Sequence, residues 1–197
     1  MNLVLASASP RRRELLTQLG VSHSCDPADL DESVHPGEPP RAYVERMARE
    51  KAATVAAREH NAGRPVIAAD TIVLVDDVDV LGKPADRFDG LAMLARLSGR
   101  RHCVITAVCL QRRGRVSCEL VETQVDFISL TRELCEAYLA TDEPWDKAGA
   151  YGIQGLAGAF VRSIEGSYSN VVGLPLCETW QLLCANGIAT GLAAADD

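Results

Sequence analysis

Residues 3–20 have the sequence LVLASASPRRRELLTQLG, a short apolar run followed directly by the start of a helix. The apolar run Leu3–Leu5 predicts a buried strand, and the segment Glu14–Leu19, followed by Gly20, predicts a helix with a glycine stop. Ser9 is a suitable N-cap. Pro10 suits the first helical position, where a missing N–H costs nothing. The chain therefore begins with a strand, a tight connection and a helix.

The charge of this first helical turn is unusual. Arg11, Arg12 and Arg13 stand at the positive end of the helix dipole, where acidic side chains are normally favourable. Free N–H groups, the hydroxyls of Ser7 and Ser9, and forked guanidinium donors together describe an anion site, so we expect this turn to bind a phosphate or polyphosphate. The alternative is that the arginines extend into solvent or pair with acids elsewhere.

Composition limits the class of protein. The chain has 197 residues, 47% of them hydrophobic and 24% charged, which is typical of one globular domain, or one domain with an added lobe. The net charge of −7 argues against a nucleic-acid surface, and no apolar run approaches the ~20 residues of a membrane span. We expect a cytoplasmic protein. Most of the seven cysteines are predicted as small core residues in a reducing compartment: Cys103, Cys109, Cys135, Cys177 and Cys184.

The order of predicted elements indicates an α/β fold. Helices are predicted at residues 41–60, 86–98, 131–139 and 174–186, and strands at 66–75, 101–112, 115–130 and 159–164. Residues 21–29 are a candidate for a further short strand. Strands and helices alternate early and antiparallel strands follow, which predicts a mixed, twisted sheet with a lobe built on the long hairpin. The tail from residue 188 is expected to fray.

Three charged residues stand out against this pattern. Asp70 interrupts VIAADTIVLV, the strongest strand signal, and a buried carboxylate is costly unless a cation, a metal or hydrogen-bond donors meet it. Asp70 either faces a site, which we favour, or is paired structurally. Lys51 lies on the apolar side of helix 41–60, where its stem could cover the core or its ammonium could point into a cleft. Lys83, in the loop LGKP, could be an ordinary exposed lysine.

The loop at residues 146–155, DKAGAYGIQG, has a glycine spacing unlike that of Walker or dinucleotide-binding loops. Its three glycines permit close approach of a ligand, and Gln154 offers both a donor and an acceptor for the edge of a base. The alternative is a glycine-rich connection without a ligand.

Ordered motifs from Leu3 to about Gly187 resemble those of the Maf family of nucleoside triphosphate pyrophosphatases, first described as septum-formation inhibitors. The motifs are Ser7-x-Ser9-Pro10-Arg11-Arg12, Asp31-Glu32, Glu50-Lys51-Ala52, Ala69-Asp70-Thr71, Leu81-Gly82-Lys83-Pro84, residues 146–155, and Asn170-Val171-Val172-Gly173-Leu174-Pro175. Several motifs in the same order make the resemblance specific.

This resemblance implies a hydrolase acting on acid anhydrides, which cleaves a nucleoside triphosphate between the α- and β-phosphates with a divalent cation (Mg²⁺, Mn²⁺ or Co²⁺). It also implies a single Maf-like domain across residues 1–197, with an elongated, ITPase-like α/β fold. The expected architecture is a central mixed twisted β-sheet flanked by helices, in two lobes with a deep cleft between them. A homodimer with a nucleotide substrate, and without a nucleic-acid or membrane partner, is expected.

The matching positions imply roles for individual residues. Asp70 would accept a proton from the attacking water, and it would act as base, as metal ligand or as both. Glu32 would help to hold the metal with Asp70, while Lys51 and Lys83 would stabilise the phosphates. The phosphate chain would be held by Ser7, Ser9, Arg11 and Arg12.

Three residues match the branch of the family that acts on dTTP and UTP: Arg11, Thr71 and Gln154. A branch acting on 7-methyl-GTP resembles this chain less, because its loop carries a glutamate where Gln154 stands. A neutral amide can satisfy the edge shared by uracil and thymine. The alternatives are a 7-methyl-GTP pyrophosphatase, an enzyme for modified pyrimidine nucleotides, and a non-catalytic nucleotide-binding regulator of septum formation.

Overall fold

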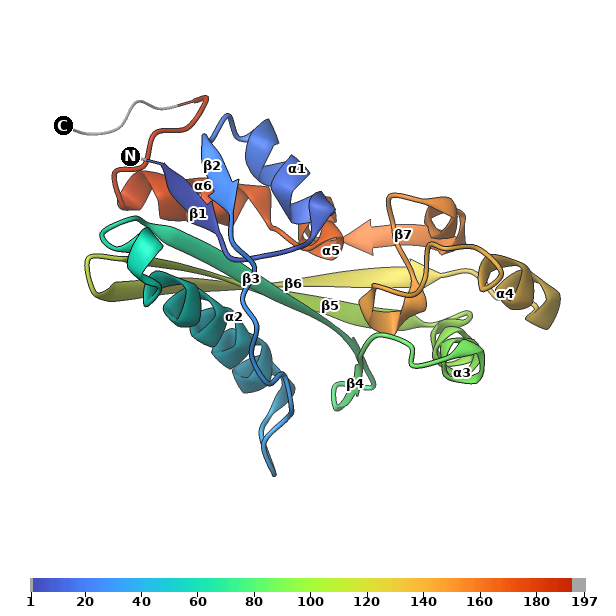
Figure 1. Ribbon diagram of the computed structural model, residues 1–197. Coiled ribbons are helices and arrows are strands. Elements are labelled where there is room, and N and C mark those ends of the chain that lie inside the picture. Colours follow the sequence, from blue (N-terminus) through green and yellow to red (C-terminus); the bar gives the residue numbers. More distant parts are fainter. Residues whose placement is uncertain (1, 193–197) are drawn as a thin grey trace. The chain divides into compact units, whose positions relative to one another are not determined.

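The computed structural model describes residues 2–192, which form a seven-stranded sheet with helices packed against it (Figure 1). The strands are β1 (Leu3–Leu5), β2 (His23–Cys25), β3 (Val66–Val75), β4 (Asp79–Leu81), β5 (Arg101–Arg112), β6 (Arg115–Phe127) and β7 (Val161–Glu165). The α-helices are α1 (Pro10–Gln18), α2 (Pro40–Ala56), α3 (Arg87–Leu97), α4 (Arg132–Tyr138), α5 (Tyr168–Val172) and α6 (Leu176–Ala185). Short 3₁₀ helices are η1 (Glu59–Asn61), η2 (Ala148–Ala150) and η3 (Leu156–Phe160).

The sheet is mixed, as predicted. Its order is β2-β1-β3-β5-β6-β7, with β4 also paired to β3. β1 pairs in parallel with β2 and with β3, so that Leu5 lies opposite both Cys25 and Ile67. β4 pairs antiparallel with β3, and β7 pairs antiparallel with β6. The predicted fold class, α/β with a mixed sheet flanked by helices, is confirmed.

The chain forms two compact units. The first consists of the described parts of residues 1–70, 106–121 and 173–197, and the second of residues 71–105 and 122–172. The long hairpin of β5 and β6 is divided between them, because its tip belongs to the first unit and its other end to the second. The long hairpin, on which a lobe was predicted, therefore contributes strand residues to both units.

The core of the first unit explains why Asp70 lies on the face of the sheet that α2 covers. α2 packs on β1 and the first half of β3 through small apolar side chains: Val4, Ala6, Ala52, Val55, Val66 and Ala68. Figure 1 shows α2 along β3, with α1 beyond β1 and β2. Side chains alternate between the faces of a strand, so Asp70, two residues after Ala68, lies on the face that α2 covers.

The first turn forms as the sequence predicts. Ser9 is the N-cap of α1 and its Oγ accepts a hydrogen bond from the Arg12 N–H at 3.4 Å, while Pro10 takes the first helical position. The Oγ of Ser7 accepts a further bond from the Ser9 N–H at 3.1 Å. The helix buries Leu15 and Leu16 and leaves its arginines at the surface or partly buried.

The tail does not fray at residue 188. Ile188 is only 7% exposed, and the Gly191 N–H donates to the Leu19 carbonyl at 2.7 Å. Gly20, with φ +70°, lies so close that a Cβ there would be 2.6 Å from the Gly191 Cα. The fraying prediction is therefore wrong up to residue 192, because a glycine pair lets the chain dock. Residues 193–197 lie outside the described part.

In the second unit, local capping again places the helices. Asp86 caps α3 by accepting from the Asp89 N–H at 2.9 Å, and Thr131 caps α4. α5 and η3 were not expected from the sequence, and β7 begins two residues later than predicted. These differences concern segments shorter than six residues, in which hydrophobic periodicity has too few positions to be decisive.

The cysteine prediction is partly wrong. Cys103 and Cys135 are buried free thiols, as expected. Cys109, however, is joined to Cys118 by a disulfide across the β5–β6 hairpin, with a Cα–Cα distance of 4.1 Å. Cys177 is exposed, because α6 turns Thr179, Leu182 and Leu183 inward instead. Within the described residues, no helix combines the length and the apolar character needed to cross a bilayer.

Candidate active site

The first unit brings three of the predicted site residues into contact. The Lys51 Nζ lies 2.6 Å from the Asp70 Oδ1 and 2.7 Å from the Glu32 Oε1. The Lys51 and Asp70 side chains are 11% and 12% exposed, whereas half of the Glu32 side chain is accessible. Two carboxylates and one ammonium thus form a group in which Glu32 is the most exposed member.

The local folding of α2 and β3 accounts for this group. Lys51 continues the buried stripe of α2, between Met47 and Val55, so its ammonium is carried toward the sheet. Asp70 meets it from β3, because the alternation of the strand turns its carboxylate toward α2. Asp70 is thus ion-paired, and its partner is another predicted site residue. The role of Asp70 in a site stays a prediction.

Arg12 belongs to the same surroundings. Its Nε donates to the Gly173 carbonyl at 2.8 Å, which anchors the side chain. Burial is the main cause that lowers the pKa of Arg12. In decreasing order, attraction to Asp70 raises this pKa, repulsion by Arg11 lowers it and attraction to Glu32 raises it. Because a guanidinium stays protonated in proteins, Arg12 presents a poorly solvated positive charge near the two carboxylates.

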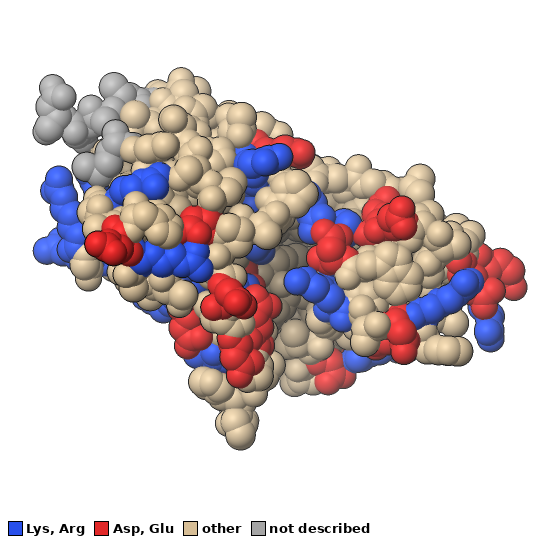
Figure 2. Space-filling view, in the orientation of Figure 1, with Lys and Arg blue, Asp and Glu red and all other residues tan. Residues whose placement is uncertain are grey.

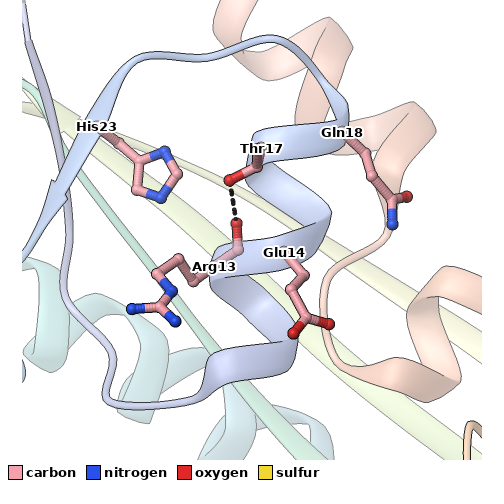
Figure 3. Close-up of a pocket in the computed structure, with 5 residues that line it drawn as sticks. All are labelled: Arg13, Glu14, Thr17, Gln18 and His23. Atoms are coloured by element: carbon pink, nitrogen blue, oxygen red, sulfur yellow. Dashed lines mark hydrogen bonds between the residues drawn. The ribbon is translucent and has the colours of Figure 1, made fainter.

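Arg13 faces elsewhere. It lines a depression of about 600 Å³ on α1 and β2 together with Glu14, Thr17, Gln18 and His23 (Figure 3). Within α1, the Thr17 hydroxyl donates a hydrogen bond to the Arg13 carbonyl at 2.9 Å. The charge of Arg12, by contrast, acts on Asp70 and Glu32.

The serines serve the turn before α1. Ser7 is buried and accepts from the Ser9 N–H, and Ser9 caps the helix, so both oxygens take part in the local hydrogen bonding. Each hydroxyl retains one proton that it can donate. Arg11 is partly buried beside them. Phosphate binding by these residues stays a prediction.

The carboxylates of Asp70 and Glu32 suit a divalent cation. Both converge on one point, where the Lys51 ammonium lies, and carboxylate oxygens are the ligands that Mg²⁺ and Mn²⁺ prefer. Among residues 2–192, no three or more His, Cys, Asp or Glu side chains are grouped to hold a metal. A two-carboxylate site of this kind fits a hydrated cation whose other ligands are phosphate oxygens.

The second unit contains the glycine-rich loop and Lys83. The Gly149 N–H donates to the Gly82 carbonyl at 2.9 Å, so the loop at 146–155 lies beside the loop that carries Lys83. Gly149 has φ +70°, and a Cβ there would press on Val73 at 3.1 Å. Lys83 and Gln154 are both exposed, and their roles stay predictions.

Glu143, which was not predicted as a functional residue from the sequence, organises this loop. Its carboxylate accepts bonds from the Tyr138 hydroxyl at 2.9 Å, the Leu156 N–H at 2.8 Å and the Ala157 N–H at 3.3 Å. A Cβ on Gly155 would lie 2.2 Å from its Oε2, so the glycine directly after Gln154 is required for this packing. No spacing signal in the sequence marks Glu143, since its partners are one tyrosine hydroxyl and two backbone N–H groups 13 and 14 residues away.

Thr71 follows Asp70 directly on β3, and successive side chains of a strand point to opposite faces. Thr71 is partly exposed there, and its predicted role in substrate binding stays a prediction. On the face that Figure 2 shows, basic and acidic side chains of the described residues are interspersed.

A family model described as "Maf-like protein" matches residues 2–186, nearly the whole chain. The chain belongs to the Maf family. The resemblance predicted from the ordered motifs is thereby confirmed.

Relatives of this Maf family chain include a dTTP/UTP pyrophosphatase of Anaeromyxobacter sp. (strain Fw109-5), 58% identical over 186 residues, which cover 92% of this chain and 87% of the relative. A dTTP/UTP pyrophosphatase of Shewanella sp. (strain MR-7) is 52% identical over 95% of this chain and 100% of its own. One of Bordetella parapertussis (strain 12822) is 53% identical, over 95% and 93%. Among solved structures, a nucleoside-triphosphatase / dITP/XTP pyrophosphatase of Mycobacterium abscessus is 17% identical, and the match covers 66% of this Maf chain and 76% of the other chain. Its TM-score of 0.43 is too low to support a conclusion.

Proposed function

We propose that this Maf family protein hydrolyses dTTP and UTP to the monophosphate and pyrophosphate. The observation that carries the proposal is that relatives 51–58% identical over more than nine-tenths of the chain bear the name dTTP/UTP pyrophosphatase. The match of Arg11, Thr71 and Gln154 to the dTTP/UTP branch supports the same substrates.

The contacts of Asp70 suggest how water is activated. Its Oδ1 is bonded to Lys51, which fixes the carboxylate and leaves Oδ2 as the atom that would accept a proton from water. Proton transfer to a positioned carboxylate contributes about 10²–10⁴-fold to a rate. Lys51 thereby orients the base as well as carrying positive charge.

Charge stabilisation would come from groups of both signs. Arg12 and Lys51 present cations to the phosphates, and Asp70 and Glu32 would hold a divalent cation. Such a cation, when bound, neutralises the phosphates and polarises the phosphorus that is attacked. Because pyrophosphate is a good leaving group once its charge is neutralised, positioning and electrostatics would supply most of the rate enhancement.

In the second unit, Gln154 would read the base. A carboxamide can donate to one atom and accept from another, which matches the edge shared by uracil and thymine. The resemblance to the Maf family also supports a divalent cation of the Mg²⁺, Mn²⁺ or Co²⁺ type, a homodimer and a cytoplasmic location as parts of this proposal.

The proposal is tested by incubating the full chain with a panel of nucleotides and each of the three cations, with separate detection of pyrophosphate and orthophosphate. We expect dTTP and UTP to give the monophosphate and pyrophosphate, and EDTA to abolish the reaction. Preference for 7-methyl-GTP or a purine triphosphate would refute the substrate, and release of orthophosphate from the nucleotide would refute the position of cleavage. Absence of any hydrolysis would favour the regulatory alternative.

A further inference from the structure

The segment that carries Glu32 has no regular secondary structure of its own. Residues 26–39 form neither helix nor strand, apart from a turn at 36–37. Within the segment, Asp31 accepts bonds from the N–H and hydroxyl of Ser33 at 2.9 and 3.0 Å, which shapes one turn only. The position of Glu32 therefore depends on side chains that reach the segment from elsewhere.

Arg46 of α2 is one of these side chains. Its Nε and NH2 donate to the two carboxylate oxygens of Glu38 at 2.6 and 2.7 Å, and NH2 also donates to the Ser33 carbonyl at 3.0 Å. The Arg46 side chain is 18% exposed and that of Glu38 10%. Arg46 thus binds the segment on both sides of the turn at residues 36–37, at Ser33 before it and at Glu38 after it.

Tyr43 binds the segment at Glu32 itself. Its hydroxyl donates to the Glu32 carbonyl at 2.9 Å, and the Arg46 guanidinium carbon lies 5.5 Å from the centre of its ring. Burial first, and then the charges of Asp70 and Glu32, raise the pKa of Tyr43 to about 12. The phenol therefore remains a donor at any physiological pH and lies within the field of both carboxylates.

One helix consequently holds Glu32 at two points. Tyr43 and Arg46, three residues apart, are neighbours on the surface of α2, and Lys51 lies further along the helix among its buried residues. Lys51 contacts the carboxylate of Glu32, whereas Tyr43 donates to the Glu32 carbonyl and Arg46 to the carbonyl of the next residue, Ser33.

We propose that Arg46 and Tyr43 are positioning residues that hold Glu32 beside Asp70, and that they thereby set the affinity of this pair of carboxylates for a divalent cation. The inference rests on the proposed function for the cation and the reaction. Groups that orient a metal ligand typically change metal affinity 10–100-fold when they are removed. A lysine cannot replace Arg46, since one ammonium cannot bind two carboxylate oxygens and a carbonyl in this planar arrangement.

A matched control lies on the same helix. Arg49 contacts Glu45 from Nε and NH2 at 2.9 and 2.7 Å, but both side chains are exposed and neither contacts the Glu32 segment in these hydrogen bonds. Removing this pair perturbs α2 in the same way without altering the support of Glu32.

The experiment compares Arg46→Met, Arg46→Lys, Tyr43→Phe and Arg49→Met with the wild type, all as full chains. Mn²⁺ binding is measured by calorimetry, alone and with α,β-imido-UTP, which resists cleavage at the scissile bond. Turnover of UTP is measured against Mn²⁺, and thermal unfolding gives the stability. We expect both Arg46 variants to weaken Mn²⁺ binding about tenfold and Tyr43→Phe about threefold, while the KM for UTP at saturating Mn²⁺ changes less than about twofold. Arg49→Met should bind Mn²⁺ as the wild type does.

Folded Arg46 and Tyr43 variants with wild-type Mn²⁺ affinity would overturn the inference, as would an Arg49 variant equally impaired. If Arg46→Met fails to fold, Tyr43→Phe alone decides, since it removes one hydroxyl. A wild type that releases no pyrophosphate but binds Mn²⁺ refutes the proposed function, and the binding comparison still tests the positioning role. A wild type that binds no Mn²⁺ under either condition overturns the inference itself.

Discussion

Replacement of Asp70 by asparagine separates chemistry from folding, and its effect on stability can be worked out from the contacts of Lys51. Removing one partner of a buried ion pair usually costs about 3–5 kcal/mol, because the other charge is left unpaired. Here the Lys51 Nζ keeps its contact with the Glu32 Oε1 at 2.7 Å, and the new amide oxygen can still accept its hydrogen bond. We therefore expect a loss of about 1–2 kcal/mol. For a chain of 197 residues this lowers the unfolding midpoint by roughly 2–8 °C.

The effect of Asp70→Asn on turnover should be far larger. If Asp70 accepts the proton, pyrophosphate release from UTP falls at least ~10²-fold. Calorimetry with α,β-imido-UTP should still detect the nucleotide bound. Glu45→Gln is the matched control, because it makes the same change at an exposed pair on α2 and should leave both turnover and midpoint unchanged. Turnover within tenfold of wild type would remove Asp70 from the chemistry, and a midpoint lowered by far more than 8 °C would show that the fold depends on it.

Three further outcomes follow from other contacts. Glu143→Ala frees the loop that carries Gln154, and the KM for UTP should rise about tenfold in steady-state assays; an unchanged KM would show that the loop holds its shape without that carboxylate. Arg46 lowers the pKa of Glu38 from 4.5 to about 2, so this carboxylate stabilises the fold above pH 4.5, and the stabilisation is lost as the pH falls to 2. The difference in unfolding midpoint between wild type and Glu38→Gln should therefore disappear between pH 4.5 and pH 2. A difference that does not change with pH would contradict the pairing of Glu38 with Arg46. Thiol titration of the denatured, unreduced protein should detect five free thiols, because Cys109 and Cys118 are joined; seven would contradict the disulfide.

The helix starts were predictable because capping is local. Ser9 before Pro10, and Thr131 before α4, each satisfy N–H groups within three residues, so the signal and the structure lie in the same short segment. The buried run of β3 was equally clear. Where the predictions fail, distant contacts decide the outcome: the docking of Gly191 on Leu19 joins residues far apart in the sequence.

For the candidate site, the sequence predicts which charged side chains require partners, but not which residues pair. Burial predicts that Asp70 requires a cation and that Lys51 requires a neighbour, and the motif resemblance selects both. That they satisfy one another across 19 residues depends on α2 packing against β3, which no periodicity specifies. Glu143 and Arg46 could not be selected at all, since their importance lies in the backbone carbonyls and N–H groups that they bind.

The charges of the first unit explain why a divalent cation belongs to the proposal. Arg12 and Lys51 would attract a triphosphate, but Asp70 and Glu32 lie within the same field and would repel it. Positive and negative side chains thus nearly cancel, and a triphosphate adds several negative charges. A cation held by the two carboxylates reverses their effect, because a bound divalent ion is then the largest local charge. Arg12 would therefore assist the binding of a triphosphate most effectively when a divalent cation is bound by the acidic pair.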